Sequence, residues 1–347
     1  MNNPLATAKM NVRLFFSAMI LFPFIAISQK TKVLIDEIKV TDNVILYKTG
    51  ETIAYPNMIA LRTSKGTVVF DTHAMVDVAK QIRGMIEKKF GKKIAYVINT
   101  HAWYDHTNGN VVFKDVPIIG HNNTVAEMTD LNNVSKDTML EKRIQRKIQR
   151  MLNYKTTFEG NKKEIDEAIE ITKAQAEMKK IEIIIPPIRF GNQMTLSLGT
   201  ATLHLYYNTP SYSTSDIIIE IPEEKILIVG DIFNKGRLPW LDAQTDFTAM
   251  NVLFSPFVSD TSQIKYFMGT HGYVMEMAEV KEQLGYINQL YKEVAQQKKT
   301  GKTVEEIKQK ITLKNFTFLS DLNPYFNGTD LNLHSLNIEE IWKQLSK

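Results

Sequence analysis

A short apolar run followed at once by a histidine-rich segment constrains this chain more than any other feature. The run IAYVI, residues 94–98, has the length and composition of a buried strand. The segment NTHAWYDHTNGN, residues 99–110, follows it and contains His101, Asp105 and His106. Neutral imidazole and carboxylate oxygen are ligands that zinc accepts. The pattern therefore predicts a metal-binding loop at the end of a strand.

Three other apolar runs are also followed, within three residues, by an aspartate or a histidine: Asp71, Asp231 and His271. Sites gather at strand ends in α/β folds because the backbone is rigid there while the loops are free to shape a pocket. The predicted metal ligands are therefore His101, Asp105, His106, Asp231 and His271, with Asp71 in a supporting role.

Asp105 and His106 are adjacent, so both can reach one ion only if the backbone turns sharply. The pair Asn108-Gly109 is typical of turns and predicts one at this point. Four other histidines are weaker candidates. We expect His73 to have a surface or supporting role and His204 to be packed in a strand; His121 ends a strand, and His334 lies in a polar tail.

Strand-like and helix-like segments alternate along the chain, which predicts an α/β fold. The first half has a predicted helix at about 76–90 among short strands, and residues 123–180 have a polar, helical pattern. The second half has strands before a helix at about 245–252, and the chain is mostly helical after 274. Two such halves predict a four-layer α/β/β/α sandwich. The predicted strands are 33–35, 44–47, 58–61, 68–70, 94–98, 116–119, 194–198, 201–207, 216–221, 225–229 and 266–268.

The predicted helical insert contains an amphipathic stretch at about 135–153. Its apolar positions are Leu140, Ile144, Ile148 and Met151, and its basic residues are placed elsewhere on the helix: Lys142, Arg143, Arg146, Lys147 and Arg150. Such a helix is typical of a solvated face, which is the interpretation we favour, and a lid or a basic binding surface is the alternative.

The first 28 residues have the pattern of a secretory signal peptide. Lys9 and Arg13 precede the apolar run 14–27, and Ala26-Ile27-Ser28 supplies small residues at the cleavage spacing. The run of 14 residues is short for a membrane span, which needs about 20. We expect cleavage near Ser28-Gln29 and a periplasmic or secreted protein; an uncleaved membrane anchor is the alternative.

Charge and cysteine content exclude several classes of function. The chain has 42 basic and 38 acidic residues, and removing Lys9 and Arg13 with the signal leaves 40 against 38. A balance this close to neutral gives no electrostatic reason to expect a nucleic-acid or membrane partner. No cysteine is present, so disulfides, thiolate ligands and a cysteine nucleophile are excluded. A metal site built from His, Asp and Glu favours zinc, iron or manganese.

The ordered series of motifs resembles the metallo-β-lactamase superfamily. The segment at 101–109 is similar to its His-x-His-x-Asp-His loop with a following glycine. Phe70-Asp71 precedes this segment, and Gly230-Asp231 and the segment GTHG at 269–272 follow it, in the order found in the family. The segment GRLPW at 236–240 resembles the family's exported hydrolases. The resemblance covers most of residues 40–275 and implies the sandwich fold for 29–275, a helical insert at about 123–180, and a helical C-terminal extension, 276–347, packed on the same domain.

The resemblance also implies two adjacent metal positions, and this chain departs from the family at one of them. The first position would be built by residues 101, 103 and 212, but Trp103 and Tyr212 stand where histidines are usual. An indole cannot ligate zinc, and a phenol with a pKa of about 10 does so only at a cost. The second position retains its complete set, namely Asp105, His106 and His271, with Asp231 shared. We expect one metal ion rather than two.

These residues predict an exported metal-dependent hydrolase of an ester, amide or lactam of a small molecule. Asp105 or His101 would act as general base, Tyr212 would donate to developing negative charge, and Trp103 would fill the vacated space or stack on a substrate ring. The alternatives are a catalytically inactive binding protein that retains the fold, and a redox protein that uses iron in the same pocket. The substrate and the oligomeric state stay open.

Overall fold

The computed structural model describes residues 33–91, 93–135, 140–207, 211–241, 244–319 and 332–346. From Val33 onward the chain forms one unit, and the predicted signal segment lies outside the described residues. Among the helices that are described, none is long and apolar enough to cross a membrane.

The first sheet has seven strands in the order in which they follow one another along the chain. The first four pair antiparallel, and β4 to β7 pair parallel. The strands are β1 (Ile35–Lys39), β2 (Val44–Thr49), β3 (Met58–Thr63), β4 (Gly66–Phe70), β5 (Ile94–Ile98), β6 (Ile118–His121) and β7 (Ile188–Phe190).

The second sheet has five strands in the order β12-β11-β10-β9-β8. Only β11 and β12 pair parallel, and the other neighbours are antiparallel. The strands are β8 (Gln193–Ser197), β9 (Thr202–Tyr207), β10 (Ile217–Ile221), β11 (Ile226–Gly230) and β12 (Tyr266–Gly269).

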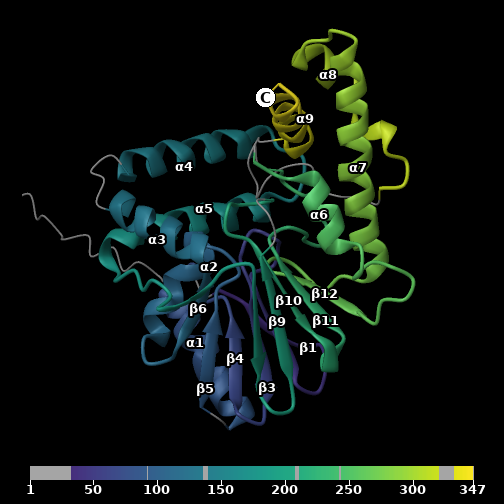
Figure 1. Cartoon of the computed structure of the whole chain (residues 1–347). Coiled ribbons are helices and arrows are strands. Elements are labelled where there is room, and N and C mark those ends of the chain that lie inside the picture. Colours follow the sequence, from purple (N-terminus) through teal and green to yellow (C-terminus); the bar gives the residue numbers. More distant parts are fainter. Residues whose placement is uncertain are drawn as a thin grey trace, which may run out of the picture. The chain divides into compact units, whose positions relative to one another are not determined.

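Three apolar clusters hold the layers together, and Figure 1 shows the two sheets with helices outside them. One cluster lies between the sheets and includes Phe70 of β4 and Ile228 of β11. A second joins the outer face of the first sheet to α1 (Val76–Phe90), where Ile82 is buried. The third joins the outer face of the second sheet to α6 (Phe247–Phe254) and α7 (Met277–Lys299). The predicted α/β sandwich is confirmed.

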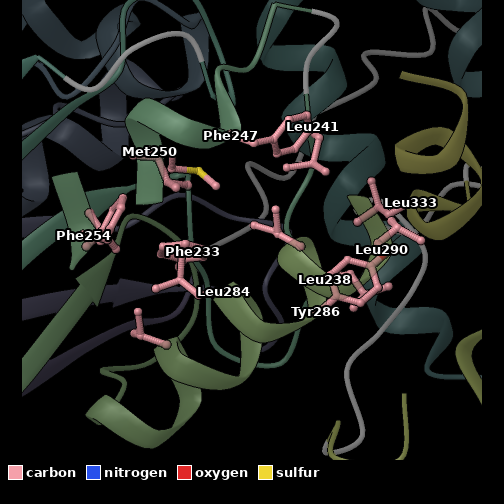
Figure 2. Close-up of a cluster of buried hydrophobic side chains, with 14 of the residues drawn as sticks. Phe233, Leu238, Leu241, Phe247, Met250, Phe254, Leu284, Tyr286, Leu290 and Leu333 are labelled. Atoms are coloured by element: carbon pink, nitrogen blue, oxygen red, sulfur yellow. The ribbon is translucent and has the colours of Figure 1, made fainter. Parts of the chain in front are cut away.

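Figure 2 shows the third cluster, in which side chains from α6, α7 and the loop after β11 point toward one another. Phe233, Met250 and Leu290 are among its members, and each is at most 1% exposed. Residues of α8 (Val304–Lys310) and α9 (Leu333–Gln344) belong to the same cluster. The helices after residue 275 therefore share the core of the second sheet.

Between β6 and β7 the chain forms α3 (Asn122–Ser135), α4 (Leu140–Thr157) and α5 (Lys162–Glu177). In Figure 1, α4 and α5 lie above the upper ends of the strands, on the side of the short helix α2 (Tyr104–Thr107). Most predicted elements lie within two residues of those observed, and α1 has the predicted bounds. Strand β7, only three residues long, was missed because so short a run carries no usable pattern.

Two sequence expectations about local structure are wrong. Asn108-Gly109 is no sharp turn but the start of a 3-10 helix (Asn108–Phe113), and the bend that presents Asp105 and His106 is the single turn of α2. Gly109 is needed for a different reason: a Cβ there would lie 1.8 Å from the carbonyl oxygen of Thr72. A side chain at this position would push the helix away from the segment after β4.

The second correction concerns Lys147 of α4, which was placed on the solvated side of its helix. Lys147 is half-buried because it lies three residues after Ile144 and four before Met151, on the buried face. Burial lowers the pKa of Lys147, and the negative charge of Asp105 partly offsets this effect. Among the residues that the structure describes, no carboxylate forms an ion pair with Lys147. The insert thus carries a half-buried lysine whose charge interacts with that of Asp105.

Candidate metal centre

The predicted ligands meet where four strands of the two sheets end. Asp71 follows β4, His101 follows β5, Asp231 follows β11 and His271 lies two residues after β12. Within each sheet the two strands concerned pair parallel, so their carboxyl ends reach the same edge. The sandwich therefore brings together residues up to 200 positions apart in sequence.

Four predicted ligands surround one point at ligand-like spacing. The Nε2 atom of His106 lies 3.4 Å from Asp105 Oδ2 and 3.7 Å from Asp231 Oδ2. The Nε2 atom of His271 lies 3.7 and 3.5 Å from the same two oxygens. Atoms that share a zinc ion at about 2.0–2.2 Å each must lie about 3–4 Å from one another. These spacings match a four-ligand site.

Each of the five predicted ligands has a buried side-chain atom without a hydrogen-bond partner among the described residues. Among the described residues, buried atoms without a partner include His101 Nε2, Asp105 Oδ1, His106 Nε2, Asp231 Oδ2 and His271 Nε2. Leaving a buried polar group unpaired costs roughly 1–3 kcal/mol. Five such atoms on the five predicted ligands fit a bound cation better than they fit a hydrogen-bonded cluster. The residues present therefore fit a metal ion.

Each of the three histidines uses its other ring nitrogen to hold its orientation. Nδ1 of His106 lies 3.1 Å from Asp71 Oδ2, and Nδ1 of His271 lies 2.9 Å from the carbonyl oxygen of Ile53. Nδ1 of His101 lies 3.1 Å from the hydroxyl of Thr100. These partners accept a hydrogen bond from Nδ1–H, which leaves the Nε2 lone pair free for a metal. The supporting role predicted for Asp71 agrees with this geometry.

Asp71 could also be counted as a ligand, since its oxygen lies within 4.8 Å of nitrogens of His101 and His106. Its oxygens, however, already accept hydrogen bonds from the backbone N–H of Thr100 at 2.8 Å and from the Thr100 hydroxyl at 2.7 Å. A second group, Asp105, His106 and His271, meets the same distance limit and has unpaired atoms. The second group is therefore the better candidate to hold a metal ion.

The electrostatics of the site favour a cation. Burial raises the pKa of Asp105 and Asp231, but the neighbouring histidines more than offset it and hold both carboxyls below their usual range. Burial lowers the pKa of His106, and Asp105 and Asp231 outweigh this effect and raise it well above the usual value. The pKa of His101 is lowered, first by burial and second by the positive charge of His106. The negative charges of Asp105 and Asp231 thus favour the protonated imidazoles of His106 and His271. A divalent cation bound here would replace those protons.

Three aromatic rings occupy the other side of His101. The Trp103 and Tyr212 rings lie 6.0 and 5.7 Å from the His101 ring, and 4.8 Å from each other. Trp240 lies 5.8 Å from Trp103 and 5.6 Å from Tyr212. The rings fill the space beside His101 where a second ion would need ligands, and within the described part of the chain His101 Nε2 is the unpaired buried nitrogen beside them.

Tyr212 is held as a phenol. Burial raises its pKa well above the usual value, and the negative charge of Asp231 adds to this shift. Its backbone N–H donates to Asp216 Oδ2 at 2.8 Å, and Ser213 donates to the same carboxylate from its N–H and its hydroxyl. A protonated, rigidly placed phenol can donate a hydrogen bond and is a poor metal ligand.

Sequence reasoning missed several residues of the site. The sequence pattern indicates Asp216 only as the first residue of a strand, and Trp240 only as the last residue of the segment GRLPW. Thr270, whose hydroxyl donates to Asp231 Oδ1, gave no signal. His73 is fully buried, so a surface role is excluded: its Nδ1 accepts from the N–H of Met75 and its Nε2 contacts Thr49.

Comparisons with known proteins identify the superfamily. Residues 52–265 match the family model described as metallo-beta-lactamase superfamily. A metallo-beta-lactamase type 2 of Bacillus cereus is 36% identical over 87 residues, 25% of this chain and 34% of that protein. A second, of Bacillus sp. (strain 170), is 37% identical over 75 residues, 22% and 29% of the two chains. The chain thus spans about a third of the length of the curated relatives it matches.

Two solved structures show the likeness in three dimensions. A metallo-beta-lactamase from Pontibacter korlensis superposes with a TM-score of 0.51 at 15% identity, over 73% of this chain and 98% of that one. The stereoselective inverting sec-alkylsulfatase Pisa1 from Pseudomonas sp. superposes with a TM-score of 0.64 at 14% identity, over 90% of this chain and 50% of that one. At such identities the likeness concerns the fold alone.

Proposed function

This chain belongs to the metallo-β-lactamase superfamily, and we propose that it is an exported hydrolase with a single metal ion, zinc or iron, acting on an ester, amide or lactam of a small molecule. The observation that carries the proposal is the convergence of four buried residues, Asp105, His106, Asp231 and His271. Each has a buried atom without a hydrogen-bond partner among the described residues, and their histidine Nε2 atoms lie 3.4–3.7 Å from Oδ2 of the two carboxylates. Export rests on the pattern of residues 9–28.

The chain's own residues suggest how the reaction would proceed. A bound metal ion would lower the pKa of a water towards about 7 and polarise the scissile bond. Asp105, whose Oδ1 has no partner among the described residues, would take the proton of the attacking water, with His101 as the alternative base. Tyr212, kept as a phenol, would donate to the developing negative charge or to the leaving group. Trp103 and Trp240, both half-buried, would form an aromatic wall beside the substrate.

A second candidate is an inactive binding protein that retains the fold. The observation in its favour is the loss of both histidines at the first metal position, with Trp103 and Tyr212 packed against each other at 4.8 Å in their place. Such a protein would keep the aromatic wall as a binding surface. The two candidates differ in metal dependence, which can be measured directly.

The test is elemental analysis of residues 29–347 after mild dialysis, followed by hydrolysis assays on ester, lactam and sulfate-ester substrates. About one zinc or iron per chain, with activity lost on chelation and restored by metal, is the expected result. Two ions per chain would overturn the single-ion proposal. No metal even after its addition would favour the binding protein. N-terminal sequencing of the exported protein checks cleavage near Ser28-Gln29.

A further inference from the structure

We propose that Glu167, on helix α5 of the insert, is a positioning residue for the predicted metal ligand His271 and acts through the loop of residues 50–57. The inference rests on the proposed metal function, since it assigns the insert a part in building the metal site. It starts from a buried carboxylate whose hydrogen bonds, among the described residues, go to the loop and not to a predicted metal ligand.

Glu167 is only 5% exposed and binds the loop at three points. Its Oε1 accepts from the backbone N–H of Glu51 at 2.7 Å. Its Oε2 accepts from the N–H of Thr52 at 2.9 Å and from the Thr52 hydroxyl at 2.6 Å. Burying a carboxylate is costly unless it is hydrogen-bonded or paired. The three bonds compensate for this cost, and they all end on two adjacent loop residues.

The next residue along the loop holds the imidazole of His271. The carbonyl oxygen of Ile53 lies 2.9 Å from His271 Nδ1, so it fixes both the ring orientation and the tautomer. The loop is also paired to the same strand end by Asn57, whose N–H donates to Thr270 O at 2.6 Å and whose side chain donates to Gly272 O at 2.7 Å. Glu167 therefore fixes the loop on one side of the Ile53 carbonyl, and Asn57 fixes it on the other.

Steric and electrostatic contacts confine the loop further. Gly50 has a φ of 69°, and a Cβ there would lie 2.3 Å from the ring of Tyr55 and 3.0 Å from both carboxylate oxygens of Glu167. The fully buried Lys48 donates from Nζ to the Gly50 carbonyl at 2.7 Å, and its positive charge is attracted by Glu167. The Glu167 carboxylate therefore packs against the turn at Gly50 as well as accepting the hydrogen bonds of Glu51 and Thr52.

The consequence concerns metal binding. A carbonyl that accepts from Nδ1 raises the basicity of Nε2 and keeps the ring aimed at the metal, and losing such support typically weakens metal affinity about 10 to 100-fold. A purely structural contact would lower stability without altering the metal site. The two roles therefore predict different results for metal affinity and for the spectrum of the bound ion.

The experiment compares Glu167→Gln with Asp166→Asn in the mature chain, using Co²⁺ titrations. Glutamine keeps the size but offers one acceptor oxygen, so one loop N–H is left facing an amide nitrogen. We expect Co²⁺ binding weakened about 10 to 100-fold, with altered d–d absorption bands. Asp166, the neighbouring residue on α5, is 49% exposed on its side chain and pairs with Lys155 on α4, so its variant should match the wild type. Affinity within twofold of wild type and an unchanged spectrum in Glu167→Gln, or an equal loss in Asp166→Asn, would overturn the proposal.

A metal-free readout separates this proposal from the proposed function. Imidazole ¹H–¹⁵N spectra of the apo protein should show His271 protonated on Nδ1, with faster exchange of that proton in Glu167→Gln. A wild type that binds no Co²⁺ would refute the metal function, and the same spectra would still decide the positioning role, because identical His271 signals in both proteins would overturn it. If Glu167→Gln does not fold, Thr52→Val, which removes one of the three bonds at nearly constant shape, takes its place with a smaller expected loss of affinity and the same deciding outcomes.

Discussion

Two residues beside the site adopt a backbone conformation that non-glycine residues rarely use. Asp71 has a φ of 56° and His73 a φ of 71°. The left-handed region costs roughly 1–2 kcal/mol per residue. The hydrogen bonds from Thr100 and the contact with His106 Nδ1 hold Asp71 in place. Strain of this kind clusters at functional sites, where the surroundings enforce one geometry.

At this scale, the ligands can be tested one by one. Asp105→Ala and His271→Ala should each lower metal content and thermal stability, because a ligand present at 100 times its Kd stabilises the fold by about 2.7 kcal/mol. His204→Ala, on the half-buried β9 strand outside the site, is the control and should keep its metal. Elemental analysis and thermal melts with and without chelator provide the measurements. Unchanged metal content in both site variants would count against the site.

Histidines introduced at positions 103 and 212 should let the protein bind a second metal ion. The double variant Trp103→His/Tyr212→His should bind a second equivalent, since it returns imidazoles to positions whose rings now lie 6.0 and 5.7 Å from the His101 ring. Trp103→Phe/Tyr212→Phe changes the same two side chains without adding ligands and should still bind one. Elemental analysis compares the two; a single equivalent in the histidine variant would mean that these positions do not face a common ion.

At the scale of single elements, strand ends and one helical turn supply the ligands, while the insert supplies support. The α2 turn presents Asp105 and His106, and α5 reaches the loop at residues 50–57 through Glu167.

The end of β6 carries a buried histidine that is not a predicted ligand. His121 there is 5% exposed and stacks on Tyr207 with ring centroids 4.0 Å apart, so its burial has an energetic cost when the ring is charged.

This burial predicts a pH dependence of stability. Burial lowers the pKa of His121 to about 4, partly offset by the backbone of Gly191, from about 6.5 in the unfolded chain. The unfolded state therefore binds the proton first, so the contribution is fully present above about pH 6.5 and is lost as the pH falls to about 4. At 1.36 kcal/mol per pKa unit the loss is about 3 kcal/mol. In urea unfolding of the metal-free protein, His121→Phe should lose less stability than wild type between pH 7 and 4; parallel curves would contradict the prediction.

At the scale of the whole molecule, the second sheet and the helices after residue 275 share one core. Leu290 of α7 is fully buried and lies in the cluster with Phe233 and Leu333 (Figure 2). Asn337 of α9 donates to the carbonyl of Pro239 at 2.8 Å, in the segment that also carries Trp240. The extension therefore stabilises the sheet and the loop that forms the aromatic wall.

A core substitution tests this coupling. Leu290→Ala should lower the free energy of unfolding by about 2–5 kcal/mol, through lost burial and the cavity left behind. Val252→Ala on α6, where the side chain is 70% exposed, should change it by less than about 0.5 kcal/mol. Chemical denaturation monitored by circular dichroism measures both. A loss below about 1 kcal/mol for Leu290→Ala would mean that α7 packs loosely on the sheet.

The sequence by itself determined the fold class and the identity of the candidate ligands. Apolar runs of strand length indicate the strands, and the polar residue after each of four runs indicates a site. Both patterns are local, so they can be recognised without knowing which segments pack against them. The bounds of α1 and the family resemblance at residues 101–109 came from the same local patterns. The metal-dependent function and the number of ions stay predictions.

Only the tertiary structure decided how the ligands are held. The Nδ1 partner of His271 is Ile53, 218 positions away, and the loop that carries Ile53 is bound by Glu167, more than 110 positions from it. Lys147 turned out half-buried: its spacing from Ile144 and Met151 indicates which face of α4 it shares, but the packing of α5 against α4 decides that this face is covered. Hydrogen-bond partners and burial depend on which segments the sheets bring side by side, and that information lies in long-range packing rather than in any local stretch of sequence.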